Sequence, residues 1–158
     1  MKAETVHQLL LMGILIGLAF AVYAAIESVV PALQHSCSVN AYVSCGKIDS
    51  SGHTTTLGIQ DYVWGIGGYL VLFALDVPLY RTWKREWLQA VTLLSGLGAL
   101  LSIYFAYVEL DVIQGLCPVC LGAYLSNVLV FGCAAYLMRL GSADRRKSTG
   151  PAESEATA

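Results

Sequence analysis

The stretch from Cys117 to Leu140, CPVCLGAYLSNVLVFGCAAYLMRL, joins a CxxC pair directly to a long apolar run. At 1.5 Å per helical residue, about 20 apolar residues cross a hydrocarbon core of about 30 Å. Two cysteines at the start of such a helix would lie where the membrane meets water. We therefore expect a transmembrane helix that carries a redox-active pair at one end.

The composition of the whole chain is that of a membrane protein. Of its 158 residues, 56% are hydrophobic and only 13% are charged, against roughly 25% charged in a soluble domain. Three more long apolar runs precede the last one: Val6 to Val30, Val63 to Tyr80 and Trp87 to Leu110. Because backbone polar groups in lipid must be paired, and the runs are too long for barrel strands, the sequence predicts an all-α integral membrane protein with a four-transmembrane-helix bundle.

The positive charges indicate how the helices are oriented. Lys and Arg lie at the N-terminus, between the second and third runs and after the fourth, whereas Lys47 alone lies in the other connections. By the positive-inside rule we expect cytoplasmic termini, with the loop at about 31–62 and the turn at 111–116 on the outer side. Residues 1–140 form the predicted membrane domain. The polar tail at 141–158 is expected to be disordered and cytoplasmic.

Four of the five cysteines fall on the outer, oxidising side: Cys37, Cys45, Cys117 and Cys120. Thiol–disulfide exchange passes electrons only between sulfur atoms that can form a mixed disulfide, so two such pairs suggest a relay. The last helix would fix the CxxC pair, and its N-terminal N–H groups favour a thiolate there. The chain has no dinucleotide-binding fingerprint, so we expect a lipid-soluble quinone as the oxidant.

Other interpretations of these cysteines remain open from the residues alone. They could form structural disulfides in a non-enzymatic membrane module. They could bind zinc, although Cys37 and Cys45 are further apart than the about two to four intervening residues usual for paired ligands. Cys133, in the middle of the last run, is expected to be a packed apolar thiol.

Ionisable side chains lie near the ends of the apolar runs. Glu109 and Asp111 flank the outer end of the third run and are expected to be solvated, and Glu27 lies near enough to the outer interface to need no partner. His7, near the other end of the first run, is expected at the membrane interface.

The joint spacing of several motifs is more specific than any one of them. Cys45 follows Cys37 by eight residues, and Ser51 comes six residues later. The second run begins with Gly-Ile-x-x-x-x-Trp-Gly-x-x-x-Tyr at 58–69, and Tyr124 follows the CxxC pair by four residues. In this combination the chain resembles the vitamin K epoxide reductase family and its prokaryotic homologues.

The resemblance covers about Val6 to Leu140. It implies a four-helix bundle around a quinone pocket, closed on the outer side by a loop with a short horizontal helix. It also implies a quinone-coupled thiol oxidoreductase that forms disulfide bonds and takes electrons from a thioredoxin-like protein. Reduction of vitamin K epoxide is the alternative activity. The residues do not distinguish ubiquinone, menaquinone and vitamin K-type quinones, and neither a metal nor nucleic acid is expected.

The resemblance assigns a role to each outer cysteine. Cys120 resembles the cysteine that reacts with the quinone, and Cys117 resembles its partner. Cys37 and Cys45 resemble the loop pair that receives electrons from the thioredoxin-like protein. The implied order is Cys37, Cys45, Cys117, Cys120 and then the quinone.

Four further residues are implied at the quinone. Tyr124 matches a tyrosine whose hydroxyl can donate to a quinone oxygen, and Ser51 matches a loop serine associated with catalysis. Trp64 is a candidate for the pocket wall, with helix packing as the alternative. Asp61 stands where the family often has an asparagine donor, and because an ionised carboxylate cannot donate, it could serve only when protonated.

No thioredoxin-like domain follows the last helix in this sequence, so we expect the redox partner to be a separate protein on the outer side. The absence of an ER retention signal favours a multi-pass protein of a prokaryotic inner membrane.

Overall fold

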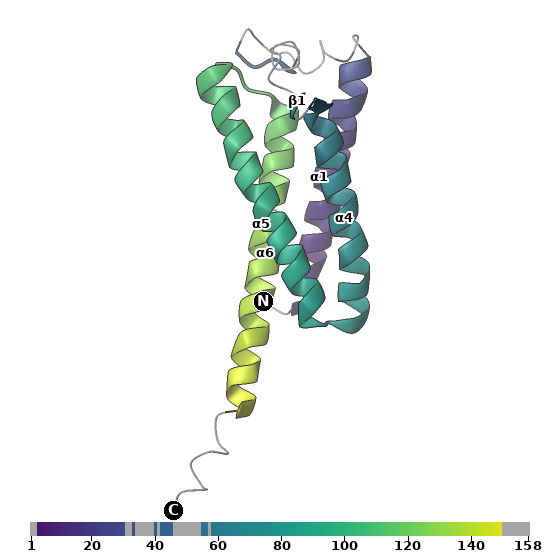
Figure 1. Ribbon diagram of the computed structural model, residues 1–158, viewed down its shortest axis with the longest axis vertical. Helices are drawn as coiled ribbons and strands as arrows, with labels where there is room; N and C mark the ends of the chain where they lie inside the picture. Colours follow the sequence, from purple (N-terminus) through teal and green to yellow (C-terminus); the bar gives the residue numbers. More distant parts are fainter. Residues whose placement is uncertain are drawn as a thin grey trace, which may run out of the picture.

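The computed structural model describes residues 3–30, 33, 40, 42–45, 55–56 and 58–149. Its long helices lie side by side and alternate in direction (Figure 1). They are α1 (Ala3–Val29), α4 (Asp61–Thr82), α5 (Arg85–Tyr107) and α6 (Pro118–Thr149). An antiparallel hairpin of β1 (Thr55–Thr56) and β2 (Ile59–Gln60) precedes α4, and a π-helical turn, η1 (Val108–Val112), continues α5. The predicted all-α four-helix bundle is confirmed.

All four helices are long and apolar enough to cross a membrane. Large apolar side chains on α5 point away from the bundle, with Leu93 75% exposed, Leu100 67% and Ile103 64%. A continuous apolar surface of this kind is stable against lipid rather than water. The chain is therefore a multi-pass integral membrane protein. The predicted horizontal helix in the first connection lies mostly outside the described residues.

The last helix is longer than the predicted span. The candidate membrane span within it is Pro118–Gly141, and the helix itself continues to Thr149. Residues 141–149, which the sequence analysis assigned to a disordered tail, are thus helical. The physical reason is local, because Ala, Arg and Lys are good helix formers and the first proline after the span is Pro151.

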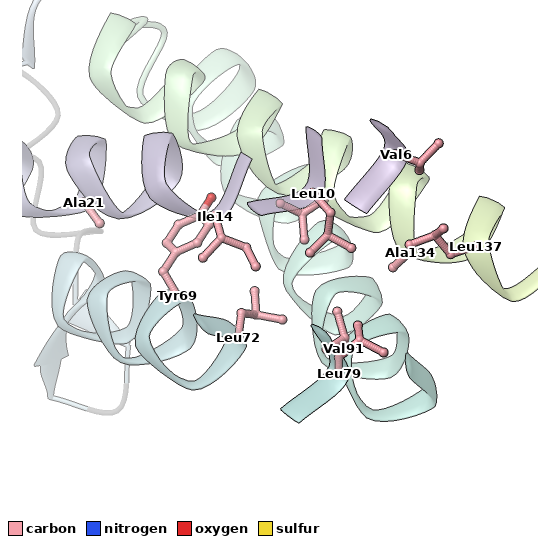
Figure 2. Close-up of a cluster of buried hydrophobic side chains, with 11 residues drawn as sticks. Val6, Leu10, Ile14, Ala21, Tyr69, Leu72, Leu79, Val91, Ala134 and Leu137 are labelled. Carbon is pink, nitrogen blue, oxygen red and sulfur yellow. The ribbon is translucent and has the colours of Figure 1, made fainter. Parts of the chain in front are cut away.

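The core lies along the axis of the bundle, where α1 packs against α6 and α4 and where α5 packs against α6. Figure 2 shows apolar side chains from all four helices meeting there. Leu10, Ile14, Leu79, Val91 and Val130 are fully buried in this cluster.

A glycine on α1 makes room for the one aromatic ring in this core. The Tyr69 ring of α4 lies against Gly17, and a methyl group added at Gly17 would overlap that ring. The Tyr69 hydroxyl donates to the Ala123 carbonyl of α6 at 2.8 Å. One side chain thus ties α4 to α6 across α1.

The bundle has a buried polar pair between α1 and α4, near the end where the described chain begins. His7 Nε2 lies 2.9 Å from Asp76 Oδ1, and both side chains are buried. Tyr80 stacks on the imidazole, with ring centroids 5.4 Å apart. His7, which was expected at the membrane interface, is thus buried near one end of the bundle, where Asp76 gives the imidazole a partner.

We predict that Gly17→Ala destabilises the protein and that Gly67→Ala does not. An added methyl group at Gly17 displaces the Tyr69 ring, and overpacking of this kind costs about 1–3 kcal/mol. Nothing lies within 4 Å of a methyl group added at Gly67. The thermal midpoint in detergent should fall by on the order of 5 °C for Gly17→Ala and stay or rise for Gly67→Ala. Equal shifts would contradict this account of the core.

Candidate functional site

The CxxC pair forms the N-terminal cap of α6. The Cys117 carbonyl accepts the Leu121 N–H at 3.0 Å, which is the first helical bond, and Pro118 takes the first helical position. The Cys117 sulfur accepts the Cys120 N–H at 3.3 Å. In most helices the oxygen of a capping side chain accepts an N–H of the first turn, and here the Cys117 sulfur accepts it instead.

A backbone bridge attaches the first connection to the residue before the CxxC pair. The Ser44 N–H donates to the Leu116 carbonyl at 3.2 Å, and the Leu116 N–H donates to the Tyr42 carbonyl at 2.9 Å. Cys45 directly follows Ser44 in the chain, and Cys117 directly follows Leu116. The bridge therefore brings the two cysteines together although 72 positions separate them in the chain.

The sulfur atoms of Cys45 and Cys117 are 3.0 Å apart, about 1 Å more than a disulfide bond. Both cysteines are buried, whereas Cys120 is half-buried. Cys45 is disulfide-bonded, while Cys117 and Cys120 are free thiols. Cys117 thus contacts both a bonded cysteine from the loop and a free thiol in its own helix, as a mixed-disulfide exchange requires.

Apolar side chains surround these sulfur atoms. The residues packed against Cys45 and Cys117 come from α1, from the turn after η1 and from α6: Phe20, Tyr23, Ala24, Ile113 and Val119. Such a lining excludes water and suits an apolar reactant.

A buried carboxyl group lies on the other side of the pair. Glu109 is 6% exposed. Its Oε1 accepts the Tyr124 hydroxyl at 2.8 Å, and its Oε2 accepts the Cys117 N–H at 3.4 Å. The carboxyl is also within hydrogen-bonding reach of the Cys120 side chain.

The expectation that Glu109 is solvated was wrong, and the π-helical turn explains why. In η1 the Ile113 N–H donates to the Val108 carbonyl five residues back, at 2.9 Å. This extra residue per turn changes the register of the helix and turns Glu109 into the bundle, while Asp111 stays exposed. An ionisable residue within an apolar run is a signal that could have identified it.

The thiol of Cys120 hydrogen-bonds to the Cys117 sulfur and thereby lowers the pKa of Cys117 below its ordinary value. The backbone N–H groups of Cys120 and Val119 add to this effect, while burial and the negative charge of Glu109 oppose it. The balance favours the thiolate, which is the nucleophilic form.

The structure places the remaining predicted residues as follows. Tyr124 is half-buried and is connected to the CxxC pair through its hydrogen bond to Glu109. Asp61 is half-buried in the first turn of α4, and Trp64, on the same turn, is 49% exposed. Neither takes part in the contacts described above. Cys37 and Ser51 lie outside the described residues.

Cys133 lies apart from this site. It is a free, half-buried thiol of α6 that packs against the apolar core, so its prediction as a packed apolar thiol is confirmed. Within the described part of the chain, no three or more His, Cys, Asp and Glu side chains are grouped to hold a metal ion.

Comparison with known families gives one match. The model of the "Vitamin K epoxide reductase family" matches residues 8–135, which include all four membrane spans nearly whole, together with Cys45, Cys117 and Cys120. No match was found among curated proteins.

We predict that Cys120→Ala raises the pKa of Cys117, because it removes the thiol that hydrogen-bonds to the Cys117 sulfur. In the reduced protein, alkylation of Cys117 followed by mass spectrometry should titrate below the value of an ordinary cysteine, about 8.5. In Cys120→Ala the same titration should move to higher pH, and in Cys133→Ala it should stay in place. An unchanged titration in Cys120→Ala would refute the assigned cause.

Proposed function

The chain belongs to the vitamin K epoxide reductase family, and from this premise we propose that it is a quinone-coupled thiol oxidoreductase that generates disulfide bonds. Members of the family are oxidoreductases linked to quinones or to vitamin K epoxide, so membership supplies the broad reaction class. The finer proposal depends chiefly on one observation, the 3.0 Å distance between the sulfur atoms of Cys45 and Cys117.

The first half of the proposed reaction passes electrons from the loop to the CxxC pair. The Cys45 thiolate attacks Cys117 in the Cys117–Cys120 disulfide and releases Cys120 as a thiolate. Cys37 then attacks Cys45, which forms the Cys37–Cys45 disulfide and releases Cys117. Two electrons move and one disulfide replaces another. A bonded Cys45 beside free Cys117 and Cys120 is the arrangement expected directly after this transfer.

The second half restores the CxxC disulfide. As Cys117 and Cys120 join, they lose two electrons and two protons, and a membrane quinone takes them up to become a hydroquinone. The surroundings fit such a reactant: Phe20 and Tyr23 supply apolar contact beside the half-buried Cys120, and the Tyr124 hydroxyl lies nearby. Quinones dissolve in the bilayer that these helices span, so this electron acceptor can reach the site from the lipid.

We further propose a thioredoxin-fold protein as the electron donor and an outward-facing position for the cysteines. α1 begins and α6 ends at one end of the bundle, whereas α4 begins and α5 ends at the other (Figure 1). Arg81 lies in the last turn of α4, Lys84 in the connection and Arg85 at the start of α5, at the end of the bundle where α1 begins and α6 ends. The positive-inside rule puts that end in the cytoplasm, which favours the inner membrane of a prokaryote with its oxidising outer side.

We predict that the purified protein in detergent reduces a short-chain quinone with dithiothreitol as donor. Cys117→Ala and Cys120→Ala should each abolish this activity, because either change removes one sulfur of the disulfide that must re-form. Hydroquinone formation, followed by absorbance, measures the rate.

Cys133→Ala is the matched control, since Cys133 is a free thiol of the same helix that lies outside the site. It should keep full activity. If no quinone is reduced by the unaltered protein, or if either CxxC variant stays active, the proposal is wrong and a structural role for the cysteines gains weight.

We predict a different result for the loop cysteines. Cys37→Ala and Cys45→Ala should lose turnover with a reduced thioredoxin-fold protein but keep it with dithiothreitol, because a small thiol reaches the CxxC pair directly. The double variant Cys37→Ala/Cys120→Ala removes both resolving thiols, so a Cys45–Cys117 disulfide should accumulate and appear as a cross-linked peptide by mass spectrometry. Unchanged partner-driven turnover in Cys37→Ala would show that the order of the relay is wrong.

A further inference from the structure

The sulfur relay leaves the buried carboxyl group of Glu109 without a task. Glu109 contacts two parts of the site at once: the Tyr124 hydroxyl at 2.8 Å and the Cys117 N–H at 3.4 Å. Its charge also acts on the thiol of Cys120, whose own N–H donates to the Cys117 sulfur at 3.3 Å. Burying a carboxylate is costly unless its hydrogen bonds compensate. A buried carboxyl group that is hydrogen-bonded to the backbone of a redox-active cysteine is a candidate for proton transfer.

The proposed reaction has a proton problem that this position solves. Closing the CxxC disulfide releases two protons, and a hydroquinone needs two. The sulfur atoms lie in an apolar lining of α1 and α6 side chains, where water is a poor carrier. A side chain within hydrogen-bonding distance of the proton it accepts removes this obstacle.

We propose that Glu109 accepts the thiol proton of Cys120 and passes it through the Tyr124 hydroxyl to a quinone oxygen. This inference rests on the proposed function and assigns that reaction a further catalytic residue.

The hydrogen bond between Tyr124 and Glu109 sets the order of the steps. The Tyr124 hydroxyl donates its proton to Glu109 Oε1, so the same proton is not directed at a quinone oxygen. Once Glu109 has taken the Cys120 proton, the neutral carboxyl group can donate to the Tyr124 oxygen. The Tyr124 proton is then free to pass to the quinone oxygen, and the Glu109 proton replaces it.

The protons and electrons balance over the cycle. Cys120 gives one proton through Glu109 and Tyr124, and both residues end in their starting states. Cys117 reacts as the thiolate, so its proton has passed to water on the outer side before this step, and the second oxygen of the quinone takes one proton from that water. The new disulfide bond supplies the two electrons.

A purely structural role would also place Glu109 here, since it ties η1 to α6. Glu109→Gln separates the two roles, because its single amide oxygen can still accept the Cys117 N–H and its amide N–H can donate to the Tyr124 oxygen, but the amide cannot take up a proton. Asp111→Asn is the matched control, since Asp111 belongs to the same π-helical turn and is exposed.

The first measurement is a single turnover. The reduced protein, freed of dithiothreitol, is mixed with a short-chain quinone, and hydroquinone formation is followed by absorbance. Glu109→Gln should slow this reaction about a hundredfold. Glu109→Asp keeps a carboxyl group on a shorter side chain and should recover at least about tenfold over Glu109→Gln. Asp111→Asn should match the unaltered protein.

The second measurement needs no quinone. The rate at which iodoacetamide alkylates Cys120 in the reduced protein reports how readily its thiol proton leaves. If Glu109 accepts that proton, Glu109→Gln should slow alkylation about tenfold at neutral pH. If Glu109 acts only through its negative charge, the same change should favour the thiolate and speed alkylation. The ionisable groups around Glu109 that can affect this alkylation rate are Cys117, Cys120 and Tyr124.

Tyr124→Phe tests the second step and covers the case in which Glu109→Gln does not fold. It keeps the carboxyl group but removes the hydroxyl, so Cys120 should be alkylated at the normal rate while quinone reduction slows about a hundredfold. The inference is overturned if the unaltered protein reduces quinone and either Glu109→Gln or Tyr124→Phe does so at a rate within about threefold of it. An unaltered protein that reduces no quinone overturns the proposed function instead.

Discussion

The short backbone bridge at Leu116 is the contact on which the site depends. Its two hydrogen bonds hold the loop residues Tyr42 and Ser44 beside the start of α6, and each such bond contributes only about 1 kcal/mol. The bridge places Cys45 next to Cys117. Its weakness suits the proposed relay, in which the loop would take electrons from another protein and would therefore have to leave and return.

The lipid environment imposes the second constraint. Helices in a bilayer satisfy their own backbone groups, so the remaining polar side chains need partners inside the bundle. Two examples among the described residues lie toward opposite ends of the bundle. His7 and Asp76 pair close to the termini, whereas Glu109 and Tyr124 pair beside the CxxC. The first pair joins α1 to α4, and the second faces a redox-active thiol, so similar chemistry serves packing at one end and supports proton transfer at the other.

The sequence predicted more of the bundle than of the site. Apolar runs of membrane-spanning length locate the helices within a few residues, because length and hydrophobicity decide insertion locally. The same apolar run also predicted that the CxxC pair lies at the start of the last helix. Glu109 was misjudged as solvated, and the buried partner of His7 was not predicted. A π-helical turn and a partner 69 positions away decide their burial, and neither leaves a periodic pattern in the sequence.

The sequence by itself therefore determined the membrane class, the number of helices and the types of residue that can carry thiol chemistry, because these depend on composition and on short-range order along the chain. Only the tertiary structure decided which sulfur atoms meet. The 3.0 Å contact of Cys45 with Cys117 and the carboxyl group of Glu109 beside Cys120 arise where a loop, a π-helical turn and a helix start converge. Such convergence depends on the packing of segments far apart in the chain.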